Sequence, residues 1–237
     1  MFVVVTLKRL LLILLAVIMV TALLVALRPD EVSPAAALNA GTMPTLIIDA
    51  GHGGEDGGAV SVNGVSESTI NLDIALKMAD LSELLGFPTR LTREGENLRY
   101  PDDCKTVASR KRYDQKQRVE LINACENALV VSIHQNSFPN ARPHGPQTFY
   151  TEHPAAKELA GLVQESLNAT LCPDNRRVAS PVAKNIFLMK SIDCPGVLVE
   201  CGFVSNKNEA QLLETDEYRL KIACAVISAY AQSTKDR

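Results

Sequence analysis

Three apolar runs, each followed closely by polar or glycine-rich residues, dominate the hydrophobic pattern of the chain. They cover Leu46–Ala50, Leu129–Asn136 and Gly196–Phe203. Short runs rich in valine, isoleucine and leucine are typical of buried strands. Three shorter runs predict further strands, at Thr89–Thr92, Gln147–Tyr150 and Ile186–Met189.

Four segments between these runs carry apolar residues at the three- and four-residue spacing of a helix. They are Ser66–Leu85, Gln115–Cys125, Ala155–Leu171 and Asn208–Ala231. Ser66 is a suitable N-cap for the first of them. On the first helix, the residues expected to face inward are Ile70, Ile74, Met78, Leu81 and Leu85. On the second helix they are Val119, Leu121 and Ile122. On the last helix they are Leu212, Leu213, Leu220, Ala223, Val226 and Ile227.

The segment Glu94–Arg112 is polar and lacks an apolar rhythm, so we predict a long loop there. Strands that alternate with helices over one domain predict an α/β fold. The fold class expected is a three-layer α/β/α sandwich with a mostly parallel sheet. In such sheets, chemistry is placed in the loops at the carboxyl ends of the strands.

The N-terminus carries the pattern of an export or membrane segment. Lys8 and Arg9 precede an apolar run from Leu10 to Leu27, which approaches the length of a membrane span. Positive charge before the run places the N-terminus in the cytoplasm and the rest of the chain outside. Ala35–Ala37 offers a cleavage signal, so a transmembrane anchor and a removed signal peptide both stay open. The chain therefore divides into one N-terminal hydrophobic helix, an alanine- and proline-rich linker and one domain, at residues 1–29, 30–43 and 44–233.

Composition narrows the class of protein. The net charge of −3 and the absence of tryptophan argue against a nucleic-acid partner. Six cysteines are present, but none form a CxxC pair, so no zinc-ribbon pattern exists. Because export is expected, a disulfide remains open, and its pairing does not follow from the sequence.

Candidate chemistry lies at the ends of the three main strands. His52 stands in a glycine-rich loop after the first strand, His134 near the end of the second, and Glu200 in the third. Glu67 opens the first helix, whose positive end favours a carboxylate. Two histidines and one glutamate form a ligand set of catalytic zinc with a position left for water. Glu200 is then available as a base. The loop lacks the GxxxxGK[ST] and GxGxxG patterns of phosphate sites, and a plain tight turn is its other interpretation.

Six short motifs follow one another along the predicted domain. In order they are DAGHGGxDGGA at 49–59, Glu67 before a helix, Thr92-Arg93, Arg118 in a helix, SIHxN at 132–136 and VECGFxSN at 199–206. From Thr45 to Ala231 the chain resembles zinc-dependent N-acetylmuramoyl-L-alanine amidases of the bacterial cell wall. The segment Gln147–Tyr150 and the VECGF ending are most similar to the sporulation-associated subgroup, which prepares the spore cortex.

The resemblance implies specific roles for these residues. His52, Glu67 and His134 would be ligands of Zn²⁺, and Glu200 the catalytic carboxylate. The substrate would be peptidoglycan, cut at the amide between N-acetylmuramic acid and L-alanine of the stem peptide, with spore-cortex modification as the finer role. We expect an exported enzyme that is anchored in the cell membrane and faces the wall, or secreted if the signal is cleaved. The sequence identifies no accessory activator.

Three further residues are candidates for supporting or substrate-binding roles. Asn136 follows His134 by two residues on a strand, so it is expected to brace that histidine or bind substrate. Arg118 is expected to pair with a carboxylate near the sheet. Glu55 is the alternative base if Glu200 proves to be a metal ligand.

Two alternative functions remain. A cysteine hydrolase would use Cys201 with His134, but neighbours on a strand point to opposite faces, so Cys201 and Glu200 do not both face the site. A catalytically silent peptidoglycan-binding or regulatory module is the second alternative. The complete set of four chemical residues argues against it.

Overall fold

The computed structural model describes residues 43–235. Within the chain, Met43–Arg237 clusters as one compact unit. The hydrophobic helix expected at residues 1–29 lies outside the described residues. None of the helices in the described part has the length and apolar character needed to cross a membrane.

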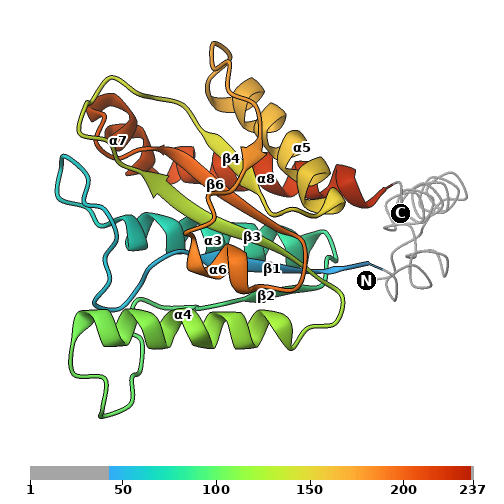
Figure 1. The fold of residues 1–237 in the computed structure, drawn as a ribbon. Coiled ribbons are helices and arrows are strands. Elements are labelled where there is room, and N and C mark those ends of the chain that lie inside the picture. Colours follow the sequence, from blue (N-terminus) through green and yellow to red (C-terminus); the bar gives the residue numbers. More distant parts are fainter. Residues whose placement is uncertain (1–42, 236–237) are drawn as a thin grey trace, which may run out of the picture. The chain divides into compact units, whose positions relative to one another are not determined.

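A six-stranded sheet forms the centre of the domain, in the order β2-β1-β3-β6-β4-β5 (Figure 1). Its strands are β1 (Thr45–Ala50), β2 (Thr89–Leu91), β3 (Ala128–Asn136), β4 (Gln147–Tyr150), β5 (Ser180–Pro181) and β6 (Gly196–Phe203). Strands β2, β1, β3 and β6 run parallel, β4 runs antiparallel to β6, and β5 runs parallel to β4. The expected mostly parallel sheet is therefore confirmed.

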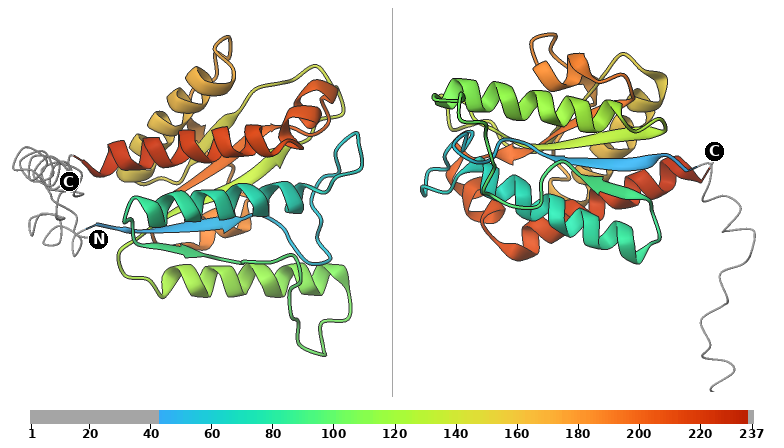
Figure 2. Two further views of the ribbon diagram at one scale, coloured as in Figure 1. Left: turned by 180° about the vertical axis from the view of Figure 1, so that it is seen from behind. Right: turned by 90° about the horizontal axis from the view of Figure 1, so that it is seen from below.

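Helices cover both faces of this sheet, as the views in Figures 1 and 2 show. One face carries α3 (Glu67–Leu84), α5 (Pro154–Leu171) and α8 (Asp216–Thr234). The other face carries α4 (Val107–Asn123) and α6 (Phe187–Ser191). A short helix, α7 (Lys207–Leu213), packs against β6. These layers confirm the three-layer sandwich.

Alternation along the strands divides the core in two. Ile48 and Val199 belong to the large core under α3, α5 and α8, whereas Ile47 and Leu198 belong to the smaller core under α4 and α6. Since side chains alternate with a period of two, the polar residues near the carboxyl ends of the strands fall on the α4 side. These residues are Asp49 in β1, Ser132 and His134 in β3, and Glu200 in β6.

The long loop predicted for Glu94–Arg112 is wrong in its second half, because α4 begins at Val107. The Thr106 hydroxyl accepts a hydrogen bond from the Ser109 amide at 3.1 Å, and the Ser109 hydroxyl accepts one from the Thr106 amide at 3.0 Å. This capping box starts the helix. The first turns of α4 lack the helical spacing of apolar residues because this side of the helix is polar and leads to the buried Arg118.

Three further expectations are wrong. Ile186–Met189 is not a strand, because α6 begins at Phe187, and a short apolar run does not by itself distinguish a strand from a helix. Asn208–Ala231 forms two helices instead of one, since Thr215 caps a new helix by accepting a hydrogen bond from the Tyr218 amide. Three leucines expected to face inward are exposed, at 54% for Leu85, 46% for Leu212 and 42% for Leu220.

Candidate active site

The loop after β1 holds His52 in an unusual backbone conformation. His52 has a φ of 61°, in the left-handed region, and no other non-glycine among the described residues has a positive φ. Gly53 and Gly54 follow, with φ values of 131° and 60°. Glycine adopts these values without steric cost, so the chain reverses here and aims the His52 ring at Glu67.

Two arginines hold this loop by its carbonyl groups. Arg93 donates hydrogen bonds to the carbonyls of Ala50 at 2.9 Å and Gly51 at 3.2 Å. Arg118 donates to the carbonyls of Ala50 at 2.6 Å and His52 at 2.5 Å. Both arginines are buried. The left-handed backbone conformation of His52 persists only where its surroundings fix it, and the hydrogen bonds from the two arginines do so.

A buried carboxylate in β1 balances the charge of Arg118. Asp49 lies 2.8 Å from Arg118 and accepts hydrogen bonds from Ser132 at 2.5 Å and Thr92 at 2.7 Å. Burial alone would raise the pKa of Asp49, but Arg118 and the two hydroxyls outweigh burial and hold that pKa below its usual value. The structure thus places Arg118 on a carboxylate of the sheet and under the His52 loop.

Glu67 is the first residue of α3, and its carboxylate is almost enclosed. Its Oε2 accepts a hydrogen bond from the Ala59 amide at 2.9 Å. Its Oε1 accepts one from the Gln135 amide at 3.0 Å and one from Asn71 at 3.3 Å. Ser66 occupies the N-cap position, but its side chain forms no capping bond. The helix terminus and these donors favour an ionised carboxylate.

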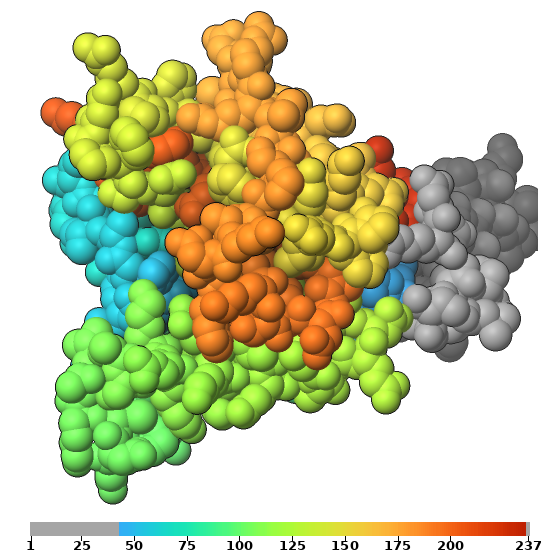
Figure 3. Space-filling model, viewed as in Figure 1, coloured from blue at the N-terminus to red at the C-terminus, as the bar shows by residue number. Residues whose placement is uncertain are grey.

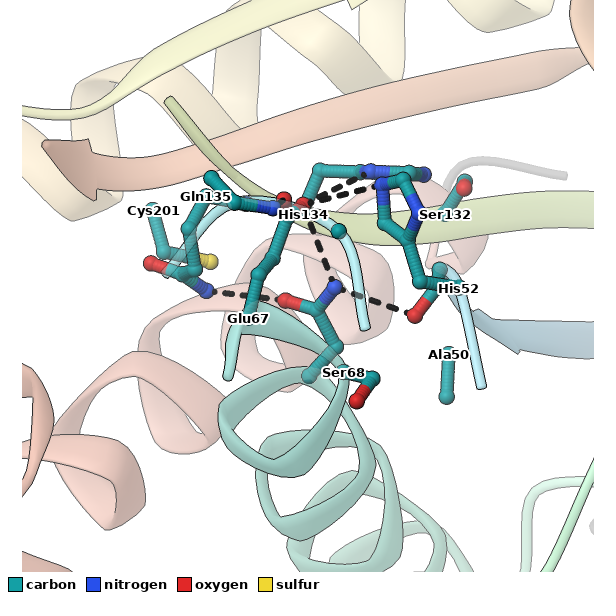
Figure 4. A network of polar contacts seen from close by, with 12 residues as sticks. Ala50, His52, Glu67, Ser68, Ser132, His134, Gln135 and Cys201 are labelled. Carbon is teal, nitrogen blue, oxygen red and sulfur yellow. Dashed lines mark hydrogen bonds and ion pairs between the residues drawn. The ribbon is translucent and has the colours of Figure 1, made fainter. Parts of the chain in front are cut away.

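His52, Glu67 and His134 converge at the carboxyl end of the sheet (Figure 4). Glu67 Oε1 lies 3.0 Å from His134 Nδ1 and 3.4 Å from His52 Nε2. Donor atoms held about 2.0–2.2 Å from one tetrahedral ion lie roughly 3.3–3.5 Å apart. The spacing and the mixed nitrogen and oxygen donors therefore fit a single divalent cation.

Two glycines leave the space that these side chains occupy. A Cβ atom on Gly51 would lie 2.3 Å from Nε2 of His134. A Cβ atom on Gly58 would lie 2.6 Å from Oε2 of Glu67 and 2.8 Å from the His52 ring. Any larger residue at either position would push a candidate ligand out of place.

A carboxylate behind His52 orients its ring. His52 Nδ1 lies 2.9 Å from Asp56, which also pairs with Lys111 at 2.8 Å. Metal-binding histidines commonly have such a partner on the nitrogen that faces away from the ion.

The surroundings of His52 and Glu67 favour the charged form of both side chains. Burial alone would lower the pKa of His52, but hydrogen bonds with Asp56 and Glu67 raise it to about 9. Burial would likewise raise the pKa of Glu67, but His134 and His52 hold that pKa far below its usual range. A divalent cation held between the three side chains would likewise be stabilised by the ionised carboxylate of Glu67.

Glu200 lies beside His134, as its direct partner across the β3–β6 pairing. Its Oε2 is buried and has no hydrogen-bond partner among the described residues. Burial raises the pKa of Glu200 to about 7. A carboxyl with this pKa gives and takes protons near neutral pH. A buried acceptor without a partner in the protein points to a bound molecule as its partner.

A cavity of about 440 Å³ opens over the cluster and Glu200. The segment that leads into α6 forms an apolar side with Ile186 and Phe187. Figure 3 shows α4 in green and the α6 segment in orange on this face of the molecule. The polar face of α4 also lines the cavity, with Lys111, Asp114, Gln115 and Arg118.

Three candidates lie apart from the cluster. Glu55 pairs with Arg110 and does not line the cavity. Asn136 lies beyond an irregularity in the β3–β6 register, and its side chain forms no hydrogen bond with the described residues. Cys201 is buried in the core on the opposite face from Glu200, and burial raises the pKa of its thiol. The structure therefore brings together the two histidines and two glutamates but not these three.

Four residues around the site were not singled out from the sequence. Asn71 follows Glu67 by four residues on a helix, a spacing that places both on one face. Asp56 follows His52 by four residues, but its position depends on the glycine conformations of the loop. Gln135 and Lys111 reach the site only through the tertiary fold.

Comparison with known proteins agrees with this geometry. The amidase type 3 family model, described as N-acetylmuramoyl-L-alanine amidase, matches residues 46–232. The germination-specific N-acetylmuramoyl-L-alanine amidase of Bacillus subtilis is 36% identical over 182 residues, which cover 76% of this chain and 76% of that protein. The amidase LytC of Bacillus subtilis is 31% identical over 77% of this chain, but the match covers only 34% of LytC.

Solved structures show the same fold. The CwlD amidase of Clostridioides difficile, in complex with the GerS lipoprotein, matches with a TM-score of 0.78 and 37% identity, over 82% of this chain and 100% of that one. The amidase AmiC2 of Nostoc punctiforme matches with a TM-score of 0.67 and 25% identity, over 80% of this chain and 96% of that one. The chain thus belongs to the N-acetylmuramoyl-L-alanine amidase family, and its activity is amide hydrolysis in peptidoglycan.

Proposed function

We propose that the chain is a zinc-dependent amidase that separates N-acetylmuramic acid from L-alanine of the stem peptide during modification of the spore cortex. One observation carries the proposal. A buried, unpartnered carboxylate oxygen of Glu200 lies in the same cavity as the cluster of His52, Glu67 and His134.

Zinc is the ion that this donor set suits best. Magnesium and calcium prefer sets made of oxygen atoms, whereas two imidazoles and one carboxylate are typical of catalytic zinc. His52, Glu67 and His134 would hold the ion. When bound, zinc polarises the amide carbonyl and lowers the pKa of water at the site.

Glu200 moves the proton that hydrolysis requires. An amide is cleaved only if water loses a proton and the departing amine gains one. Glu200 accepts the water proton on its free oxygen and returns it to the leaving nitrogen. Its pKa of about 7 leaves the carboxylate available near neutral pH and makes it an effective acid once protonated.

The similarity to the germination-specific amidase of Bacillus subtilis supports the role in the cortex. The CwlD amidase of Clostridioides difficile is in complex with a lipoprotein, which supports an accessory protein for this chain as well. We infer an external location from Lys8 and Arg9 before the apolar run. A C-terminal reporter that is active only in the cytoplasm would contradict that location.

Zinc content, measured together with muropeptide products from purified peptidoglycan, tests the activity. Glu200→Gln should retain zinc and bind peptidoglycan but lose turnover by about 10²–10⁴-fold. Cys201→Ser, the matched control next to it on the strand, should remain active. Normal turnover by Glu200→Gln would contradict the mechanism, and a dead Cys201→Ser enzyme that tolerates chelators would indicate a thiol hydrolase. Peptidoglycan binding without product release from the wild type would indicate a silent module.

A further inference from the structure

The face of α4 that lines the cavity contains two side chains that the mechanism leaves unused. Lys111, Asp114, Gln115 and Arg118 follow helical spacing, so they project from one side. Asp114 and Arg118 pair with each other at 2.8 Å, and Lys111 pairs with Asp56 at 2.8 Å.

Lys111 is a cation with donors to spare. Its ammonium group carries three protons and meets Asp56 at 2.8 Å. Its side chain is 42% exposed, whereas that of Arg118, the other permanently charged base on the cavity wall, is 5% exposed. Gln115 lies one helical turn further along and forms no side-chain hydrogen bond with the described residues. Of the two basic side chains of α4 that line the cavity, Lys111 is therefore the one accessible to an anionic group.

This pair lies close to the reacting centre. Asp56 bridges His52 at 2.9 Å and Lys111 at 2.8 Å, so the ammonium group lies two hydrogen bonds from the His52 ring. An extended peptide advances about 3.3–3.6 Å per residue. A substrate whose scissile amide lies at the cluster thus brings its next residue or two to the level of Lys111.

We propose that Lys111 and Gln115 form a subsite for the free α-carboxylate of the residue that follows the alanine of the stem peptide. The inference rests on the proposed function, since it places the scissile amide at the cluster. Ile186 and Phe187, which also line the cavity, carry no charge. A carboxylate in the cavity therefore finds its exposed cation on α4 and not on the segment at α6.

Two synthetic fragments test the subsite with the full-length, metal-loaded protein. One is N-acetylmuramoyl-L-alanyl-D-glutamate, and the other is its α-amide, N-acetylmuramoyl-L-alanyl-D-isoglutamine. We expect the wild type to prefer the acid in kcat/KM by about tenfold, the low end for a hydrogen bond to a charged group. Lys111→Met should abolish the preference, with a larger fall in kcat/KM for the acid than for the amide, and Lys111→Arg should keep it. Lys116→Met is the matched control, because Lys116 is an exposed lysine of α4 that does not line the cavity.

A purely structural role for Lys111 would change zinc content and affect both fragments equally. Equal use of acid and amide by the wild type, or a preserved preference in Lys111→Met, would overturn the subsite. If the wild type cleaves neither fragment, the proposed amidase activity is contradicted for these two substrates. A binding measurement then tests the subsite separately from the activity. Calorimetric titration of Glu200→Gln should show tighter binding of the acid, and Glu200→Gln combined with Lys111→Met should not. Equal binding of the two fragments by Glu200→Gln would also overturn the subsite.

Discussion

Glu200 destabilises the folded protein at high pH, and this effect can be measured separately from catalysis. Burial raises the pKa of Glu200 from 4.5 to about 7. Since the pKa is raised in the folded state, the contribution to stability is fully present below the unfolded value and is lost as the pH rises through the folded value. A change from 4.5 to about 7 corresponds to a loss of about 3 kcal/mol by about pH 8.

Glu200→Gln removes this titration while keeping the shape of the side chain. The free energy of unfolding of the variant relative to the wild type should therefore increase by about 3 kcal/mol between pH 4.5 and about pH 8. The comparison of two pH values cancels costs that do not depend on pH, such as the unpaired amide that glutamine places at the buried Oε2 position. The variant would thus lose turnover but become more stable relative to the wild type as the pH rises.

Urea titration followed by circular dichroism, on a chain covering residues 43–237 with a metal chelator, measures the free energy at each pH. Glu83→Gln is the control, because Glu83 is an exposed carboxylate on α3. The control should show no comparable increase. A stability difference between Glu200→Gln and the wild type that stays constant with pH, or shrinks as the pH rises, would refute the assignment of Glu200 as a carboxyl with a raised pKa.

Three other substitutions test the site. His134→Ala should lower zinc occupancy and abolish turnover, and a metal-to-protein ratio equal to the wild type would contradict its role as a ligand. Gly51→Ala should also lower occupancy, because the new Cβ would lie 2.3 Å from the His134 ring, while far-UV circular dichroism stays unchanged. Asp49→Asn should cost about 3 kcal/mol in urea unfolding, since it breaks a buried ion pair with Arg118. In the wild type, the lowered pKa of Asp49 contributes to the free energy of unfolding above pH 3.8, and this contribution is lost as the pH falls further. Measuring the free energy of unfolding at a series of acidic pH values tests this.

The sequence predicted the three long strands correctly because each is a buried run of apolar residues bounded by polar ones. It missed the first half of α4 and mistook α6 for a strand. The first half of α4 has a polar face toward the cavity and no apolar period, whereas the apolar spacing in its second half predicted a helix from Gln115. The apolar run at Ile186–Met189 is too short for its spacing to distinguish a helix from a strand. The chain forms the short helix α6 there, and Ile186 and Phe187 line the cavity.

The candidate site was largely predictable because parallel strands deliver their last residues to one edge of a sheet. The register that pairs His134 with Glu200 is a direct consequence of that geometry. The contacts that orient these groups were not predictable. Asp56 reaches His52 only through left-handed glycines, and Lys111 lies in the first half of α4, before the helix that the pattern predicted from Gln115.

The conformation of His52 links the stability of the domain to its chemistry. A left-handed conformation at a residue other than glycine costs on the order of 1–3 kcal/mol. Four hydrogen bonds from Arg93 and Arg118 to the carbonyls of residues 50–52 offset that cost. Contacts within the protein therefore hold the loop in this conformation. Candidate ligands held in place in this way lose little conformational freedom when an ion binds, so more of the intrinsic binding free energy appears as affinity. The two arginines would therefore influence metal binding through the backbone of the loop that carries His52.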